Sequence, residues 1–380
     1  MQLSLGLDIG STTVKAVVLD GARTVFSRYR RHNADARGAL RTLLTEIEER
    51  FPDAAMACAV TGSAGLGVAD LMRIAFVQEV IAGTEAVERF VPDADVVIEL
   101  GGEDAKITYL RPAVEQRMNG TCAGGTGAFI DQMATLLHTD AAGLDELAGG
   151  ADHLYPIASR CGVFAKSDLQ PLLNQGAAHT DLAASVFQAV ATQTIAGLAQ
   201  GHPIRGTVVL LGGPLHFLPN LRVAYERSLA EQVDAFVTPD DAHLYVALGA
   251  ALLAPDDASR ATPGVLRARL TDTVMLPLVS PRLRPLFADD DERDAFAARH
   301  AGTADDRIDL ADADGPLFLG IDAGSTTIKA VLLDDAGRIA YAHYQPSNDP
   351  VAAARGILAA VHRDLPLSAY LARACVTGYG

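Results

Sequence analysis

Short apolar runs that alternate with small polar turns open this 380-residue chain. The first run, Leu3 to Ile9, meets Gly-Ser-Thr-Thr and is followed by a β-branched run from Val14 to Leu19. Two such runs joined by a tight polar turn are typical of a β-hairpin. The same order recurs at 316–323 and 328–333 around a second Gly-Ser-Thr-Thr. The pattern therefore predicts two hairpins of one design.

Strand and helix periods alternate after the first hairpin. Leu40, Leu43, Leu44 and Ile47 recur at helical spacing, which predicts an amphipathic helix over 36–50. The same reasoning predicts strands at 54–60, 94–100, 105–110, 207–211 and 235–238, and helices within 66–90 and at 127–138, 163–174, 181–201, 219–232 and 241–254. This order matches an α/β domain in which a hairpin-and-helix lobe is used twice.

Changes in composition along the sequence divide the chain into three parts. Residues 1–254 hold the complete two-lobe domain, whereas 255–315 is rich in proline and acidic residues and is expected to be a linker with little core of its own. Residues 316–380 repeat hairpin, helix and strand, and we expect them to be the start of a second, truncated copy. Such a half-lobe should expose apolar surface.

Composition narrows the possible partners and compartments. The chain is 49% hydrophobic and 21% charged, with a formal net charge of −16 and no Trp. This charge argues against binding to nucleic acid or to an anionic membrane surface. No basic leader precedes the first strand, and no apolar stretch is expected to span a membrane, so a cytoplasmic location is expected.

The repeated segment itself suggests a ligand. Gly6 to Asp20 and Gly320 to Asp334 share Asp, Ser, Thr and Lys at the same spacing. A Gly-Ser-Thr turn presents backbone N–H groups and hydroxyls that suit phosphate oxygens, and Asp8 at the strand end can hold Mg²⁺. A simple polar hairpin turn is the alternative. It does not require these residue types to recur together, so nucleotide phosphate with Mg²⁺ is favoured.

Two further loops complete a possible nucleotide site. Glu99 to Asp104 forms the turn of another expected hairpin, which would face the first hairpin across a cleft. Gly212-Gly-Pro214 follows a strand, where missing side chains would let an adenosine approach the backbone. In this order the three loops resemble the actin-like ATPase superfamily, with its ribonuclease-H-like fold, which also contains sugar and acetate kinases and heat-shock chaperones.

The four cysteines are widely spaced, as expected of free thiols or metal ligands rather than disulfides. Cys122 and Cys161 each precede an expected helix, and a helix N-terminus lowers a thiol pKa. Two thiolates suit half of an iron–sulfur cluster, which another subunit or repeat would complete. The alternative is that both are small buried hydrophobic residues. Cys58 and Cys375 lie on expected strands, and we predict that they belong to the core.

Four segments make the resemblance more specific. They resemble the activator (activase) family of 2-hydroxyacyl-CoA dehydratases and benzoyl-CoA reductases, in its long fused form. The resemblance implies a homodimer that shares one [4Fe-4S] cluster and uses ATP to drive single electrons from ferredoxin or flavodoxin onto the dehydratase or reductase. The segments are Cys122-Ala-Gly-Gly-Thr-Gly, Cys161-Gly-Val-Phe-Ala, Leu100-Gly-Gly-Glu-Asp-Ala-Lys106 and Ala247-Leu-Gly-Ala-Ala-Leu252.

Roles transfer by motif. Cys122 and Cys161 would be the cluster ligands, Asp8 the catalytic group, and Glu99 or Asp104 the water-orienting group. Glu99 also departs from the pattern, because the small members of the family have Asp-x-Gly-Gly-Gln at this turn. The first phosphate site would comprise Asp8, Gly10, Ser11, Thr12, Thr13 and Lys15, the second Gly101 and Gly102, and the adenosine loop Gly212 and Gly213.

Two other functions remain open on the same fold. A small-molecule kinase would use Glu103, Asp104 or Asp131 as a base and would bind no iron. An ATP-switched structural or chaperone module would tolerate serine at Cys122 and Cys161. Anaerobic absorbance near 400 nm would separate an iron–sulfur activator from both.

Overall fold

The computed structural model describes residues 2–120, 124–158, 162–255, 260–271, 284–301, 305–324, 326–347 and 349–378. The chain divides into two compact units. Residues 1–169 and 178–276 form the first unit, and residues 170–177 and 277–380 form the second.

The first sheet of the first unit has the strand order β3-β2-β1-β4-β5. Strand β1 (Leu3–Ile9) pairs antiparallel with β2 (Thr13–Asp20), so the expected hairpin is confirmed. Strand β4 (Ala57–Thr61) lies parallel to β1 on its other side. The outer strands are β3 (Arg23–Arg31) and β5 (Ala75–Phe76).

The second sheet repeats this arrangement in the order β8-β7-β6-β9-β10. Strand β6 (Val96–Leu100) pairs antiparallel with β7 (Ala105–Tyr109) and parallel with β9 (Gly206–Leu211). Strands β8 (Glu115–Met118) and β10 (Val233–Val237) complete it. The lobe used twice in one domain, as the sequence predicted, is therefore present.

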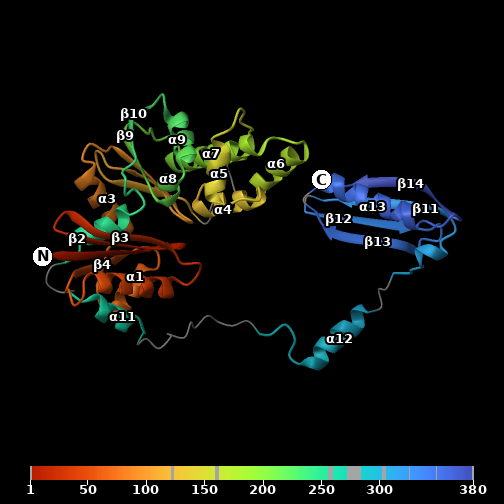
Figure 1. The fold of residues 1–380 in the computed structure, drawn as a ribbon, viewed down its shortest axis with the longest axis horizontal. Helices are drawn as coiled ribbons and strands as arrows, with labels where there is room; N and C mark the ends of the chain where they lie inside the picture. The colour runs from red at the N-terminus through yellow and green to blue at the C-terminus, as the bar shows by residue number, and fades with distance from the viewer. Residues whose placement is uncertain are drawn as a thin grey trace. The chain divides into compact units, whose positions relative to one another are not determined.

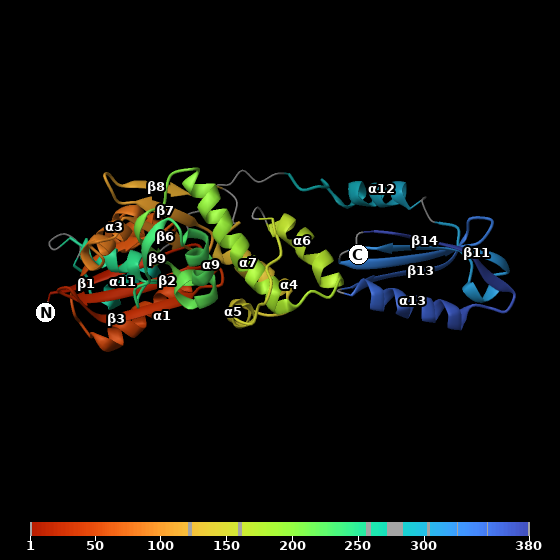
Figure 2. The same ribbon diagram turned by 90° about the horizontal axis from the view of Figure 1, so that it is seen from above.

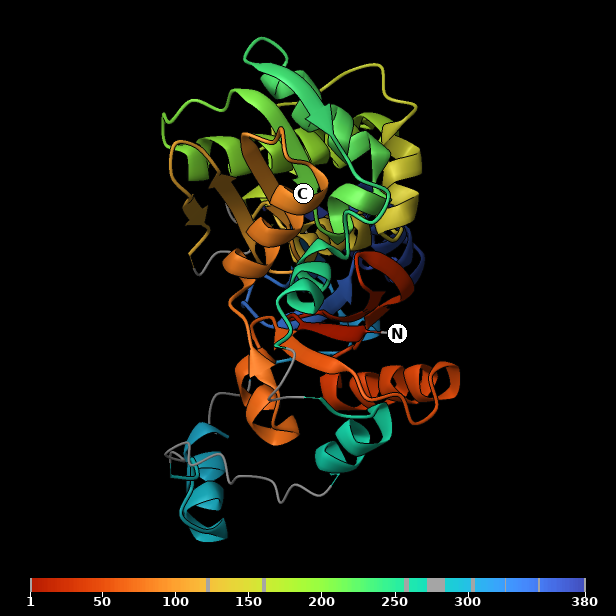
Figure 3. The same ribbon diagram turned by 90° about the vertical axis from the view of Figure 1, so that its left-hand side faces the viewer.

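Helices cover the two sheets on separate faces. Helix α1 (Ala36–Arg50) lies along the first sheet (Figures 1 and 3). Its four predicted apolar residues are buried in the core that it shares with this sheet. On the opposite face, a second core joins β2, the second sheet, α3 (Glu79–Phe90) and α10 (Tyr245–Leu252). The described part of this unit also contains α2 (Gly65–Met72), α4 (Gly127–Leu136), α5 (Ala141–Ala148), α7 (His179–Thr194), α8 (Gly213–Phe217) and α9 (Pro219–Leu229). Helix α6 (Gly162–Asn174) begins in this unit, and its residues from Gln170 onward belong to the second.

Several elements were not expected from the sequence. Strand β3 is rich in Arg, and its burial pattern is mostly exposed or intermediate, so it lacks the apolar run by which β1 and β2 were recognised. Strand β8 is similarly polar. Helix α5 is only eight residues long. Each is held by pairing or packing with neighbours rather than by a strong local pattern.

Helix α7 continues into a π-helical turn, Ile195–Ala199. Over His179–Ala199 the chain is long and apolar enough to cross a membrane by length and composition alone, so the expectation of no such stretch was wrong. The physical reason is tertiary: 67% of the apolar window is buried inside the protein, as in a core helix.

The segment expected to be a linker contributes to the first unit. Helix α11 (Pro263–Thr271) packs against α1 and α2, and its Leu266 and Leu270 are buried in the core beneath the first sheet. A bridge between Met56 and Ala261 ties the segment to β4. Helix α12 (Asp290–His300), by contrast, buries no residue.

The second unit is built on a sheet in the order β13-β12-β11-β14. Strand β11 (Gly315–Ala323) pairs antiparallel with β12 (Thr327–Leu333) and parallel with β14 (Ala369–Thr377). Strand β13 (Ile339–Pro346) is the outer strand, and α13 (Pro350–Asp364) lies along one face (Figure 2). The order and directions match β3-β2-β1-β4. That residues 316–380 begin a second ATPase copy stays a prediction.

Candidate functional site

The first glycine turn joins β1 to β2. The N–H of Gly10 donates to the carbonyl of Thr13 at 3.0 Å, which closes the turn. The N–H of His32 donates to the carbonyl of Thr12, and the His32 ring lies 3.1 Å from the carbonyl of Gly10. The exposed Ser11 stands at the tip. The turn is therefore fixed by its base while its tip stays open to a ligand.

Asp8 and Lys15 form an ion pair at the base of this turn. The Lys15 Nζ lies 2.5 Å from the Asp8 Oδ2, and Asp8 is only 3% exposed. Burial disfavours the charged ammonium, but the attraction of Asp8 and Glu99 outweighs it and raises the pKa of Lys15. A buried carboxylate held in place by this ion pair is suited to binding a divalent cation.

The second glycine turn lies directly beside the first. A Cβ atom added to Gly102 would lie 2.0 Å from the hydroxyl oxygen of Thr12. The N–H of Gly101 donates to the carbonyl of Asp104 at 2.7 Å, which closes this turn as Gly10 closes the other. The two loops can thus contact one chain of phosphates.

Helix α4 begins on the second turn. The N–H groups of Gly127 and Ala128 donate to the carbonyls of Gly101 and Gly102, at 3.0 and 2.7 Å. A Cβ at Gly127 would lie 3.3 Å from the ring of Pro214, so the third loop also meets this point. The three loops that the sequence singled out therefore converge in one unit.

The third loop needs glycine for its backbone. Gly212 has φ +95, and a Cβ there would lie 2.0 Å from the carbonyl oxygen of Leu100. The following Gly213 lies against the Tyr29 hydroxyl, 2.6 Å from where its own Cβ would be. Glycine at both positions lets the strand end, the loop and the aromatic ring pack together.

A cavity of about 480 Å³ opens beside Gly213. Apolar groups dominate its wall, and the Arg31–Asp131 ion pair, with N–O distance 2.8 Å, lies at its edge. A cavity of this volume can hold the planar heterocycle of a small-molecule ligand. The lining residues are Tyr29, Arg31, Gly127, Ile130, Asp131, Ala141, Ala142, Gly213, Pro214, Phe217 and Leu218.

The two cysteines predicted as cluster ligands, Cys122 and Cys161, lie outside the described residues. The helices expected after them are present, since α4 begins at Gly127 and α6 at Gly162. A Cβ added to Gly162 would lie 2.7 Å from the Gln132 side chain of α4. The start of α6 therefore packs on the first turns of α4. Among the described residues there is no group of three His, Cys, Asp or Glu able to hold a metal.

Comparison with known proteins decides the family. Residues 5–254 match the model of the BadF/BadG/BcrA/BcrD ATPase family. The chain belongs to this family.

Solved structures and a curated relative agree with that assignment. The (R)-2-hydroxyglutaryl-CoA dehydratase activating ATPase of Acidaminococcus fermentans is 31% identical over 262 residues, which is 68% of this chain and 98% of the relative. The crystal structure of the dehydratase component A from that organism matches with TM-score 0.61 at 30% identity, covering 67% of this chain and 98% of that one. The activator of 2-hydroxyisocaproyl-CoA dehydratase from Clostridium difficile, with bound ADPNP, matches with TM-score 0.58 at 28% identity, covering 68% and 96%. The fold is that of the actin-like ATPases, and the chain is an ATPase.

The charged cluster of this ATPase extends further than the sequence predicted. Lys106 is 6% exposed and pairs with Glu79 of α3, and its Nζ lies 3.6 Å from Glu99. Burial opposes its charge, but the two glutamates raise its pKa. Burial also raises the pKa of Glu79, although Lys106 acts against it. Glu99 is thus shared between two lysines, whereas Glu103 is exposed. No sequence signal pointed to Glu79.

An aromatic cluster beside Gly213 was also missed. Tyr29 packs edge-on against Phe217 and His243, with ring centroids 5.3 and 5.4 Å apart. The His216 and His243 rings are 3.9 Å apart. Lys15 lies 6.0 Å from the Tyr29 ring. The cluster connects the Gly212–Gly213 loop to the first glycine turn. Its members come from segments too far apart in the sequence for a motif to reveal.

We expect acid to destabilise this cluster. Burial, with His216 and Lys15, lowers the pKa of His243 to about 4, whereas an unfolded histidine titrates near ~6.5. Between these values the unfolded chain binds a proton that the folded one does not. The contribution of His243 to the free energy of unfolding should therefore be at its maximum above about pH 6.5. It should fall by up to about 3 kcal/mol as the pH drops to about 4.

Urea unfolding followed by circular dichroism at several pH values measures this slope. His243→Phe, which keeps a ring but cannot titrate, should flatten it. The matched change at the exposed His179 should leave the slope unchanged. An equal slope in the His243 variant and the native ATPase would contradict the assignment.

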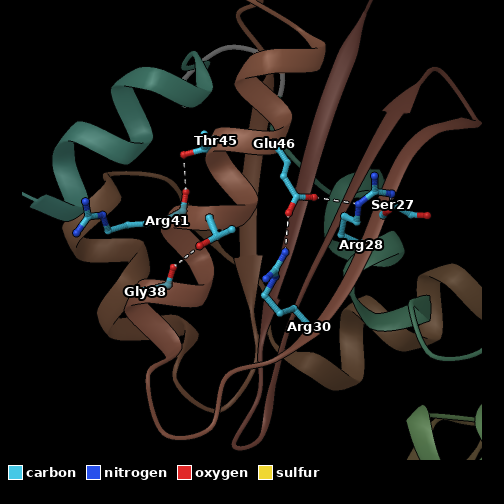
Figure 4. Close-up of polar contacts among 8 residues, drawn as sticks. Ser27, Arg28, Arg30, Gly38, Arg41, Thr45 and Glu46 are labelled. Atoms are coloured by element: carbon cyan, nitrogen blue, oxygen red, sulfur yellow. Dashed lines mark hydrogen bonds and ion pairs between the residues drawn. The ribbon is translucent and has the colours of Figure 1, made fainter.

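A larger hollow, of about 730 Å³, lies between β3 and α1. Figure 4 shows Glu46 of α1 bound to Arg28 and Arg30 of β3, at 2.9 and 2.7 Å. None of its lining residues belongs to a glycine loop. The smaller cavity beside Gly213, which is lined by residues of the third glycine loop, is therefore the better candidate site of the ATPase.

Proposed function

We propose that this chain hydrolyses ATP to drive single low-potential electrons onto an enzyme of the 2-hydroxyacyl-CoA dehydratase or benzoyl-CoA reductase type. One observation carries the proposal. Helix α4, which follows Cys122 in the sequence, begins with hydrogen bonds from Gly127 and Ala128 to the second phosphate turn. A change at the nucleotide would thus reach the helix that follows Cys122 in the sequence.

The three loops would hold ATP in one orientation. Its phosphates would contact the N–H groups and hydroxyls of the turns at 10–13 and 101–102, which lie side by side. Its base would enter the cavity beside Gly213, between the apolar walls and the Tyr29 ring. The size and apolar lining of the cavity suit adenine, and the glycines admit the ribose to the backbone.

Hydrolysis would depend on position and charge rather than on covalent catalysis. Asp8 would hold Mg²⁺, directly or through water, and its ion pair with Lys15 keeps the carboxylate in place. Glu99 or Asp104, on the opposite hairpin, would orient the attacking water. Asp131 would not act as a base for a phosphoryl acceptor, because it is paired with Arg31.

Cys122 and Cys161 would hold half of a [4Fe-4S] cluster. The packing of Gly162 on α4 supports this, since it brings the starts of the two helices together. The cluster, completed by a second subunit or a second repeat, would supply one-electron transfer. A cytoplasmic ferredoxin or flavodoxin would be the donor, and the dehydratase or reductase component the acceptor.

The proposal predicts a separation of two activities. Cys122→Ser and Cys161→Ser should each abolish the broad absorbance near 400 nm of anaerobically purified protein and its electron transfer to an artificial acceptor. ATP turnover should stay within about twofold, because neither residue belongs to the phosphate loops. Cys375→Ser is the matched control and should change neither property.

Anaerobic spectra and phosphate release measure the two activities. A colourless native protein with full ATP turnover would contradict the iron–sulfur function and leave the ATPase alone.

A further inference from the structure

Two glycines at the same place in two sheets have opposite surroundings. Gly6 of β1 lies so close to α10 that an added Cβ would be 2.0 Å from the carbonyl oxygen of Ala247 and 2.4 Å from the amide nitrogen of Ala251. Gly320 holds the matching place in β11, two residues before an Asp paired with a Lys. No atom of the described chain lies within 4 Å of a Cβ placed there.

The neighbours of Gly320 are uncovered in the same way. In the first sheet, the side chains around Gly6 are buried: Val17 is 1% exposed, Leu19 0% and Ala59 0%. In the second unit, the matching places hold the half-buried Val331, Leu333 at 36% exposure and the exposed Cys375. The prediction that Cys375 belongs to the core was therefore wrong, because no described helix covers this face, whereas α13 covers the other.

Glycine at position 320 has no other explanation in the described structure. It lies inside a strand, where glycine weakens pairing and packing. Its φ is not positive, so the backbone does not require glycine there. A glycine in a strand interior often marks the close approach of another backbone, which is the role of Gly6 against α10.

We propose that the face of β11, β12 and β14 around Gly320 docks an apolar α-helix whose contact surface consists of alanine and glycine. This face, the Gly320 face, comprises Phe318, Gly320, Val331, Leu333 and Cys375. The chain itself shows what such a helix looks like. Helix α10 reads Tyr-Val-Ala-Leu-Gly-Ala-Ala-Leu, and its small residues let its backbone rest on Gly6.

The chemistry of the face restricts the partner. Only small residues allow a helix backbone to approach a glycine strand this closely, so a helix with leucines in the contact row would be held away. Phe318 and Leu333 are apolar and 37% and 36% exposed. Arg373, opposite Phe318, and the Asp322–Lys329 pair place charges at the edges of the face, so the apolar contact is confined to the centre around Gly320. Covering Phe318 and Leu333 would remove an exposed apolar patch of the kind that marks an interaction site.

Thiol protection tests the proposal on the full chain. The probe is a synthetic peptide of residues 241–254 with a lysine tag for solubility. Alkylation of Cys375 by N-ethylmaleimide is followed by peptide mass spectrometry. Cys58 serves as an internal reference, because burial raises its pKa to about 11 and it should react slowly throughout. At about ten times its Kd, the peptide should slow alkylation of Cys375 about tenfold.

Two controls isolate the close approach. A peptide carrying Ala247→Leu and Ala251→Leu should give no protection. In the protein, Gly320→Leu should abolish protection, and the matched change Gly356→Leu, at an exposed glycine on α13, should leave it intact. Circular dichroism confirms that each variant is folded, and the peptide pair tests the idea on native protein alone.

Two results would overturn it. Equal protection by the leucine peptide would mean that the face binds apolar peptides without selecting small residues. Protection of Cys375 in the chain alone that rises with protein concentration would mean that the face joins two copies of this chain.

Discussion

Replacing Asp8 by asparagine is expected to lower ATP turnover about 10²–10³-fold, the usual loss on removing one preorganised charged group from a reacting centre. Asp8 is buried at the base of the first phosphate turn and paired with Lys15 at 2.5 Å. Asparagine keeps the shape and can accept a hydrogen bond from Lys15, but it provides no negative charge to hold Mg²⁺. Phosphate release under saturating ATP measures the loss.

The chain contains its own control for this change. Asp322 pairs with Lys329 at 2.7 Å in the second hairpin, in the same local sequence. Its hairpin belongs to the second unit, whereas the second glycine turn and the Gly212–Gly213 loop belong to the first. Asp322→Asn should therefore leave turnover within about twofold of the native value. Undiminished activity in the Asp8 variant, with the protein folded by circular dichroism, would remove Asp8 from the mechanism.

Replacing Gly6 by alanine is expected to cost about 3 kcal/mol or more of unfolding free energy, at the upper end of overpacking effects. The new Cβ would meet the backbone of α10 at 2.0 and 2.4 Å, and a backbone inside a packed helix cannot move aside as a side chain can. Helix α10 also contacts α3, where Gly249 lies against the carbonyl of Ala82, so it is held from both sides. Urea unfolding followed by circular dichroism measures the loss.

Gly320→Ala is the matched control. The same residue change at the same place of the second hairpin meets open space, so stability should be unchanged or rise slightly because alanine restricts the unfolded chain. If the two variants lost equal stability, the close approach of α10 to β1 would not be the cause.

The local sequence pattern was sufficient to predict the helices and strands whose apolar residues recur with a strong period. Helix α1 begins and ends where its four core residues predict, and both glycine hairpins form with the expected strands. The exposed, arginine-rich β3 could not be found in this way, because the backbone of β2 holds it rather than its own side chains. Leu266 and Leu270 were not predicted as core residues for a related reason. They lie in a proline-rich segment, and they become buried only where that segment packs against α1.

The candidate site likewise contains some residues that the sequence could predict and others that it could not. The glycine turns, with Asp and Lys at fixed spacing, could be predicted from the sequence, because the backbone geometry of a turn depends on neighbouring residues. The sequence could not predict the roles of Glu79, Tyr29 and His243. Each comes from a different element and contacts the site only after the sheets have packed.

By itself, the sequence determined the repeated hairpin, the order of the lobes, the three glycine loops and the kind of ligand they suit, because turns and strand periods are set by neighbouring residues. Only the tertiary structure decided that Thr12 meets Gly102, that α4 begins on the second turn, and that Gly6 is covered while Gly320 is bare. Those facts depend on which surfaces, far apart in the chain, come to exclude water from one another.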